Sequence, residues 1–264
     1  MNILAVDIGN TNIDIGLFLD ATIDPIQSIP GSSKAKLKKA FQDAWSKVPR
    51  VATSKEGKRD GVIVACSVKP AWTKMIKDLV KEALDERIYL IGKDIPIQLG
   101  SWVDDPTEVG TDRMVAATAA YAVVEGAVAV IDIGTAITID LVDPNGVFQG
   151  GSIFPGFELS AQALNEYTAQ LPKVKIERPT EPYGKNTHDA ITCGIYYAVI
   201  GALQETVRRY AEKLGTWPQT IITGAGAKLI QADCEFIDTY VPNLVVTGIV
   251  LTYKDYLEKE RELG

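Results

Sequence analysis

The segments Asp7-Ile8-Gly9-Asn10-Thr11 and Asp132-Ile133-Gly134-Thr135-Ala136 decide the fold, because nearly the same polar turn follows an apolar run twice in one chain. The two turns begin 132 − 7 = 125 residues apart. After each turn, apolar residues alternate with other residues, which is the period of a strand with one buried face. Each copy is therefore predicted to form a tight β-hairpin. The duplication predicts two related half-domains that face a shared cleft.

The hairpins differ from the two familiar nucleotide-binding loops, both of which lead into a helix whose N-terminus holds phosphate. The chain has no Gly-Lys-Ser/Thr run and no G-x-G-x-x-G after a strand. Glycine and small polar residues still let phosphate oxygens approach the backbone, and an aspartate can hold hydrated Mg²⁺. The simpler alternative is that such residues only make good turns. Because the turn occurs twice, a role in binding a ligand is favoured over a purely structural turn.

Composition indicates a globular protein that recognises its ligand locally. The 264 residues are 46% hydrophobic and 23% charged, and the formal net charge of −7 opposes nonspecific binding to nucleic acid or anionic membranes. A phosphorylated ligand would then be held by backbone amides, metal and a few basic side chains. His188 is the only histidine, which disfavours a Ser-His-Asp hydrolase or a zinc site made of several histidines.

The cysteines and the N-terminus predict a cytoplasmic protein. Cys66, Cys193 and Cys234 are scattered and lack C-x-x-C spacing, as expected of reduced, buried thiols. No basic region precedes the first apolar run, and no apolar stretch approaches the roughly 20 residues that span a bilayer.

Between the two turns and after the second, strands alternate with amphipathic helices, which is typical of an α/β layer. Helices are predicted at residues 34–48, 71–84, 114–124, 158–168, 187–212 and 244–260, and strands at 62–65, 88–91 and 220–222. The helix at 114–124 is expected to join the two halves, and residues 171–185 are expected to form a mobile loop.

The densest chemistry lies in the segment 106–113, whose sequence is PTEVGTDR. Gly110 allows close backbone approach, the free N–H groups of a helix N-terminus can hold an anion, and Arg113 can bind a carboxylate as a fork. Asp112 would then lie beside an anionic substrate and could accept a hydroxyl proton. The alternative is that Thr111 or Asp112 only caps the helix. The position of the segment 106–113 between the two halves favours a binding role.

Together these residues closely resemble the type III pantothenate kinases, which share a superfamily with acetate and sugar kinases, actin and the heat-shock ATPases. The resemblance runs essentially from end to end, and its motifs stand in the family's order at residues 7–12, 110–113, 132–136, 150–156, 186–187 and 223–226. It implies an α/β protein of two duplicated actin-like (ribonuclease H-like) half-domains, each a mixed sheet flanked by helices, with the active-site cleft between them. Residues 1–113 would form the N-terminal half-domain, and residues 114–264 the C-terminal half-domain with dimerisation helices.

The resemblance also implies an activity: transfer of the γ-phosphate of ATP to the primary hydroxyl of pantothenate, giving 4′-phosphopantothenate for coenzyme A synthesis. ATP would contact Asp7, Ile8, Gly9, Asn10, Thr11, Asn12, Ile13, Asp14 and Thr135, with Mg²⁺ held near Asp7 through the phosphates. Pantothenate would contact Gly110, Thr111, Asp112, Arg113 and Thr187, with Asp112 as the catalytic base. Asp132 would help to bind a monovalent cation, K⁺ or NH₄⁺. Family members are homodimers whose pantothenate site lies at the subunit interface.

One position departs from the family pattern. Where relatives usually carry a tyrosine, three residues before Pro106, this chain has Val103 beside Trp102. Either Trp102 supplies an equivalent wall of the substrate pocket, or substrate affinity is reduced. Two other functions stay open on sequence grounds: another small-molecule kinase or phosphohydrolase of the superfamily, and a nonenzymatic nucleotide-binding regulator.

Overall fold

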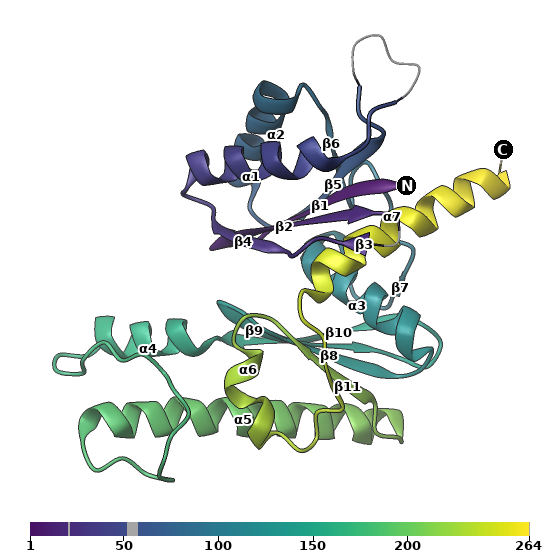
Figure 1. Cartoon of the computed structure of the whole chain (residues 1–264). Helices are drawn as coiled ribbons and strands as arrows, with labels where there is room; N and C mark the ends of the chain where they lie inside the picture. Colours follow the sequence, from purple (N-terminus) through teal and green to yellow (C-terminus); the bar gives the residue numbers. More distant parts are fainter. Residues whose placement is uncertain (21, 52–57, 264) are drawn as a thin grey trace. The chain divides into compact units, whose positions relative to one another are not determined.

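The computed structural model describes residues 1–20, 22–51 and 58–263, and its contacts divide the chain into two compact units (Figure 1). Unit 1 comprises Met1–Leu99, Asp105–Ala119 and Val245–Gly264, and unit 2 comprises Gly100–Asp104 and Ala120–Leu244. Helix α3 (Thr111–Val124) therefore begins in unit 1 and ends in unit 2. The division at residues 113 and 114 stays a prediction, while the contacts group the last helix with unit 1.

Unit 1 is built on a mixed sheet with the strand order β3-β2-β1-β5-β6, and β4 also pairs with β2. Strand β1 pairs antiparallel with β2 and parallel with β5, and β5 pairs parallel with β6. The strands are β1 (Asn2–Ile8), β2 (Asn12–Leu19), β3 (Thr22–Ile23), β4 (Gln27–Pro30), β5 (Gly61–Ser67) and β6 (Ile88–Leu90). The helices are α1 (Lys34–Lys47), α2 (Pro70–Leu84) and α7 (Leu244–Leu263), together with the start of α3 and the 3₁₀ turn η1 (Pro106–Glu108).

Unit 2 repeats this plan with the strand order β12-β11-β8-β9-β10-β7. Strand β8 pairs antiparallel with β9 and parallel with β11, as β1 does with β2 and β5. The strands are β7 (Gly100–Ser101), β8 (Val128–Ile133), β9 (Ala136–Val142), β10 (Val147–Pro155), β11 (Gln219–Thr223) and β12 (Thr239–Tyr240). The helices are α4 (Phe157–Glu166), α5 (Thr187–Leu214), α6 (Ala227–Ile230) and the 3₁₀ turn η2 (Gln231–Asp233). The predicted duplication of the hairpin is confirmed, and each hairpin also pairs with a parallel strand.

Local signals in the sequence explain where the helices begin and end. Asn186 caps α5, because its side chain accepts a hydrogen bond from the Asp189 N–H, and α5 ends at Gly215 in the left-handed conformation at φ 75°. Pro70 occupies the first turn of α2, where a missing N–H costs nothing.

Helix α5 is long and apolar enough, by length and composition alone, to cross a bilayer, contrary to the sequence expectation. Its inner face is buried in the core of unit 2, and a core helix gives the same pattern. The segment 171–185 lacks regular secondary structure, as expected, yet Val174 and Ile176 are buried in that core. Their burial anchors part of the segment.

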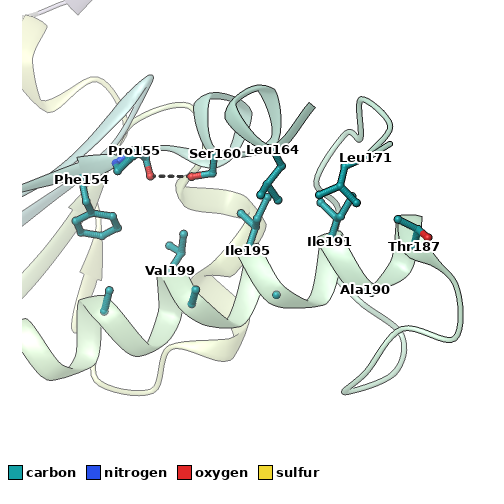
Figure 2. Close-up of a pocket in the computed structure, with 13 residues that line it drawn as sticks. Phe154, Pro155, Ser160, Leu164, Leu171, Thr187, Ala190, Ile191, Ile195 and Val199 are labelled. Atoms are coloured by element: carbon teal, nitrogen blue, oxygen red, sulfur yellow. Dashed lines mark hydrogen bonds between the residues drawn. The ribbon is translucent and has the colours of Figure 1, made fainter. Parts of the chain in front are cut away.

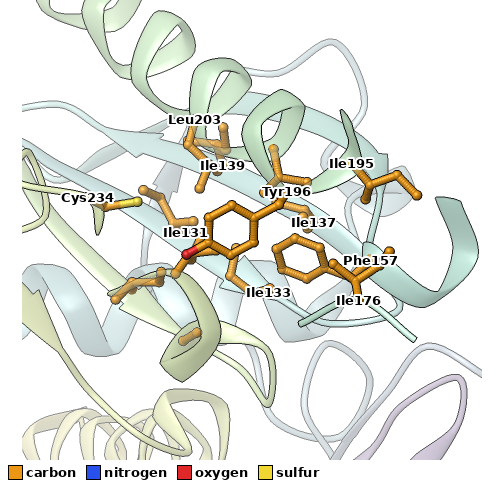
Figure 3. Packing of buried hydrophobic residues seen from close by; sticks show 14 of the residues in the cluster. Ile131, Ile133, Ile137, Ile139, Phe157, Ile176, Ile195, Tyr196, Leu203 and Cys234 are labelled. Carbon is orange, nitrogen blue, oxygen red and sulfur yellow. The ribbon is translucent and has the colours of Figure 1, made fainter. Parts of the chain in front are cut away.

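The core of unit 2 contains one large polar-tipped side chain, Tyr196 of α5, which is fully buried (Figure 3). Its hydroxyl donates to Asp233 Oδ2 at 2.5 Å and lies 3.2 Å from the Leu229 carbonyl oxygen. Asp233 also pairs with Arg178 of the segment 171–185. Burial and the hydrogen bond to Asp233 raise the pKa of Tyr196, so its hydroxyl stays protonated and donates. Asp233 therefore links Tyr196 of α5 to Arg178 of this segment.

Tyr196→Phe should lower the free energy of unfolding by about 1–2 kcal/mol, because Asp233 loses a charge-assisted hydrogen bond while the ring packing is kept. Urea denaturation would measure the change. The matched control is Tyr197→Phe on the same helix, whose side chain is exposed and should change stability by less than about 0.5 kcal/mol. Equal stability of the two variants would contradict the role given to the Tyr196 hydroxyl.

Candidate active site

The first hairpin presents an open turn at the end of β1. Ile8 pairs with Ile13, and the Gly9 N–H donates to the Asn12 carbonyl at 3.1 Å, so residues 9–12 form the loop. The side chains of Asn10, Thr11 and Asn12 are exposed. Ile8 and Ile13 are buried in the core, so any contact that they make with a nucleotide would come from their backbone.

A row of polar side chains crosses four strands beside this turn. Asp7 of β1 is paired with Asp14 of β2 and with Cys66 of β5, and Asp14 is paired with Ser28 of β4. Residues paired directly across strands point to the same face of a sheet, with Cβ atoms about 4.5–5.5 Å apart. Two carboxylates thus stand next to each other at the carboxyl end of β1.

Burial perturbs the second of these carboxylates. Desolvation raises the pKa of Asp14, although a hydrogen bond with Ser28 opposes the shift. Its Oδ1 atom is buried and has no hydrogen-bond partner. A buried oxygen in this condition favours a proton or a cation beside it.

The start of α3 is hydrogen-bonded to the end of β5. The Thr111 hydroxyl donates to the Ser67 carbonyl at 3.2 Å and lies 3.3 Å from the Ser67 N–H, which donates to it. The Gly110 carbonyl accepts from the Arg113 and Met114 N–H groups, so the helix starts at this point. An ideal Cβ at Gly110 would lie 2.5 Å from Asp112 Oδ1, so a larger residue there would displace the carboxylate.

Asp112 is partly buried in unit 1, and its Oδ1 accepts a hydrogen bond from the Arg113 N–H at 2.8 Å. Desolvation raises the pKa of Asp112, although this hydrogen bond and the charge of Arg113 act in the opposite direction. A raised pKa makes the carboxylate a stronger base than one in water.

Cys66 connects the two predicted parts of the site. Its Sγ donates to Asp7 Oδ1 at 3.2 Å, and the thiol is fully buried. Desolvation raises the pKa of Cys66 well above its usual value, and the charges of Asp7 and Asp112 raise it further. Both carboxylates therefore lie close enough to one buried thiol to act on its ionisation. The predicted phosphate turn and the segment of the predicted base thus both adjoin the end of β5, within unit 1.

The second hairpin has a shorter turn than the first. Ile133 pairs with Ile137, which leaves residues 134–136, and the Gly134 N–H donates to the Ala136 carbonyl at 3.1 Å. Thr135 is exposed at its tip. Asp132 of β8 is paired with Thr138 of β9 and Thr223 of β11, where the first unit has a second aspartate and a cysteine.

Two glycine segments, from the motifs at residues 150–156 and 223–226, contact this second turn. The Gly156 N–H donates to the Thr135 carbonyl at 2.9 Å, and the Gly226 N–H donates to the Ile133 carbonyl at 2.9 Å. Gly224 has φ +90°, and an ideal Cβ there would lie 2.3 Å from Asp132 Oδ1. The close approach of Gly224 to Asp132 requires glycine.

Thr187 is one of the residues that line an apolar pocket of about 670 Å³ in unit 2 (Figure 2). The lining residues come from α4, α5, the end of β10 and one loop: Phe154, Pro155, Ser160, Leu164, Leu171, Thr187, Ala190, Ile191, Gly194, Ile195, Ala198, Val199 and Ala202. His188 is exposed beside Asp189 on the same turn of helix. Trp102 is 79% exposed, and Val103 lies 3.6 Å from the position of an ideal Cβ at Gly150.

Sequence reasoning treated Cys66 only as a buried thiol and did not single out Ser28 or Ser67. Their contacts depend on the register between strands that are distant in sequence. The available signal was weak: Cys66 and Ser67 directly follow the apolar run at residues 62–65, as Asp7 follows the first one.

Solved structures support the fold. The chain resembles a Campylobacter jejuni protein described as a conserved member of the Baf family of transcriptional activators, with a TM-score of 0.61 at 17% identity, covering 96% of this chain and 98% of that one. It also resembles ADP-bound MreB5 of Spiroplasma citri, with a TM-score of 0.51 at 11% identity and coverage of 100% and 99%. These likenesses concern the fold, which is actin-like α/β as predicted.

Sequence comparison identifies the family. The model of the type III pantothenate kinase family matches residues 3–209. A type III pantothenate kinase of Dehalococcoides mccartyi strain CBDB1 is 33% identical over 252 residues, covering 96% of this chain and 95% of the relative. One from Agathobacter rectalis is 32% identical over 266 residues, covering 96% of each chain. This chain therefore belongs to the type III pantothenate kinase family.

Proposed function

We propose that the protein transfers the γ-phosphoryl group of ATP to the primary hydroxyl of pantothenate, giving 4′-phosphopantothenate and ADP. The observation that carries the mechanism is that Asp7 accepts a hydrogen bond from Cys66 while Thr111, the neighbour of Asp112, is hydrogen-bonded to Ser67, the next residue of β5, within one unit. Phosphoryl transfer depends mainly on positioning and on neutralising charge. A phosphate-binding turn and a carboxylate base near each other supply both.

The proposed nucleotide site is the turn 9–12 with the carboxylates of Asp7 and Asp14. The exposed turn offers backbone N–H groups and small polar side chains to phosphate oxygens. Mg²⁺ is commonly held by one or two carboxylates together with substrate phosphates and water. Two adjacent carboxylates, one of which has an oxygen without a hydrogen-bond partner, fit such an ion. The bound metal would neutralise charge on the phosphates.

Asp112 is the proposed general base. The hydroxyl oxygen of pantothenate would attack the γ-phosphorus and form the new P–O bond, while the bond from that phosphorus to the bridging oxygen of ADP breaks. The hydroxyl proton would pass to Asp112, whose pKa is raised by burial. Arg113 offers a guanidinium fork for the pantothenate carboxylate. Gly110 and Thr111 set the backbone on which both side chains stand.

The remaining assignments follow from family membership and are proposals for this chain. Thr135 would contact phosphate, Asp132 would help to hold K⁺ or NH₄⁺, and Thr187 would contact pantothenate. The protein would act in the cytoplasm. Another small-molecule kinase or phosphohydrolase, or a regulator without turnover, is not favoured by family membership.

A homodimer is also proposed, and helix α5 supports it. Small residues recur at every fourth position along the apolar pocket, as Ala190, Gly194, Ala198 and Ala202. Apart from its chain neighbours and the nearby backbone of its own helix, no described atom lies within 4 Å of an ideal Cβ at Gly194. Small residues at this spacing allow a second helix to approach closely.

An ADP-release assay with pantothenate, sugars and short-chain acids tests the function. We expect release to depend on pantothenate and Mg²⁺, and to rise with K⁺ or NH₄⁺. Release with a sugar or acid but none with pantothenate would overturn the proposed substrate. Comparing protein alone with protein in extract would detect a regulator that needs a partner.

Asp112→Asn should lower kcat by about 10²–10⁴-fold and leave ATP binding in place, because the amide keeps the hydrogen bond from Arg113 but cannot accept the proton. Its melting temperature at neutral pH should not fall. The raised pKa means that the folded state favours the protonated carboxyl, so ionisation costs stability above that pKa, and an amide avoids this cost. Exposed Asp78→Asn is the control. A fully active Asp112→Asn enzyme would remove the base assignment.

Asp7→Asn should raise the Mg²⁺ concentration needed for half-maximal activity by about tenfold, since one carboxylate of the pair loses its charge. Titration of activity with Mg²⁺ at saturating ATP would measure this. Asp43→Asn on the exposed face of α1 is the control and should leave the titration unchanged. An unaltered Mg²⁺ dependence of Asp7→Asn would contradict the proposed role.

Ala198→Arg should convert the proposed dimer into a monomer, because a long charged side chain would occupy the small-residue face of α5. Light scattering after size-exclusion chromatography would give the mass. Gln204→Arg is the control, since Gln204 is exposed and lies roughly 120° away around the same helix. A wild-type monomer, or a dimer that survives Ala198→Arg but not Gln204→Arg, would contradict this interface.

A further inference from the structure

Lys69 lies directly against the turn that we assign to the ATP phosphates. It follows β5 and stands at the N-cap of α2, in unit 1. Its Nζ donates to the backbone carbonyl oxygen of Asn10 at 2.7 Å, although the two residues are 59 positions apart in the sequence. From the sequence, Arg113 was the basic side chain predicted to lie in the active site.

The backbone of Lys69 is fixed by its neighbour. A residue before proline is restricted to extended conformations, and Lys69, which precedes Pro70, has φ −129° and ψ 90°. Its backbone N–H also donates to the Ser67 hydroxyl at 3.3 Å. The side chain therefore starts from a defined direction at the end of the sheet.

Trp72 supports the far end of the side chain. The Lys69 ammonium lies 3.3 Å from the centre of the Trp72 ring, a cation–π contact. The ring can occupy this place because residue 31 is glycine: an ideal Cβ there would lie 2.1 Å from Cζ3 of Trp72. The Gly31 N–H in turn donates to the Thr11 carbonyl at 3.1 Å, so the ring, the turn and the ammonium are held in one local structure.

Neither of these contacts places a full negative charge beside the Lys69 ammonium. A carbonyl oxygen and an aromatic ring stabilise an ammonium only partly, and the lysine has three N–H donors. The same turn stands next to Asp7 and Asp14, and the chain carries a net charge of −7. A polyphosphate that approaches these carboxylates needs compensating positive charge.

We propose that Lys69 binds the phosphate chain of the nucleotide, as a cation positioned by Asn10 and Trp72. The inference rests on the proposed function, because it takes the turn 9–12 as the phosphate site. When the nucleotide is bound, a phosphate oxygen accepts from the ammonium, which remains over the Trp72 ring. The positive charge then offsets repulsion between the phosphates and the neighbouring carboxylates.

The test measures binding without pantothenate, by calorimetry with ADP and with adenosine in the presence of Mg²⁺. Lys69→Met keeps most of the side-chain length and removes the charge, and it should weaken ADP binding by about ten- to hundredfold. Adenosine binding should change by less than about twofold, since adenosine has no phosphate. Lys74→Met, at an exposed position of the same helix, is the matched control and should bind ADP like the wild type.

Two further readouts separate phosphate binding from a structural role. Lys69→Arg keeps the charge and should recover most of the ADP affinity. Added salt should weaken ADP binding to the wild type more steeply than binding to Lys69→Met, because one ionic contact is missing from the variant.

Wild-type ADP affinity in Lys69→Met, or an equal loss of adenosine and ADP binding, would overturn the proposal. Lys69-dependent ADP binding in a protein that does not phosphorylate pantothenate would instead overturn the proposed substrate and leave the role of Lys69 in place.

Discussion

The parallel pairing of β1 with β5 is the constraint on which the proposed chemistry of unit 1 depends. Its register puts Cys66 next to Asp7, and the following residue, Ser67, receives the hydroxyl of Thr111 at the start of α3. A slip of one residue would turn every side chain of β5 to the opposite face of the sheet. The apolar faces of both strands are buried, which makes such a slip costly. Packing of the core thereby sets the positions of the carboxylates.

The same arrangement works against stability. Asp14 and Asp112 both have a raised pKa because they are withdrawn from water, and Asp14 retains an oxygen without a hydrogen-bond partner. Buried carboxylates are costly unless a proton, a cation or donors compensate them. Natural sites for anions and metals often retain such groups, since ligand binding removes the cost. Lys69 would add a cation to this acidic group.

The two units share a topology but differ in the polar row beside the hairpin. In unit 1 the row contains Asp14, Asp7 and Cys66, whereas the equivalent positions of unit 2 contain Thr138, Asp132 and Thr223. Unit 2 instead brings glycine segments close to its aspartate, with Gly224 in a conformation that side chains rarely adopt. A pair of carboxylates suits a divalent cation with phosphates, whereas the row in unit 2 contains a single carboxylate. A duplicated fold can thus carry different chemistry in its two copies.

The sequence by itself determined the features that depend on neighbouring residues. The alternation after Asp7 and Asp132 predicted both hairpins, and Asn186 and Gly215 marked the ends of α5, because hairpin turns and helix caps are made by residues close in the chain. The motif order indicated the family.

Only the tertiary structure decided which distant residues meet. The contacts of Cys66 with Asp7, of Thr111 with Ser67 and of Lys69 with Asn10 each join residues more than 40 positions apart. Strand register and core packing produce these contacts, and neither can be read from local periodicity. The burial that raises the pKa of Asp112 likewise arises only when elements from different parts of the chain surround it.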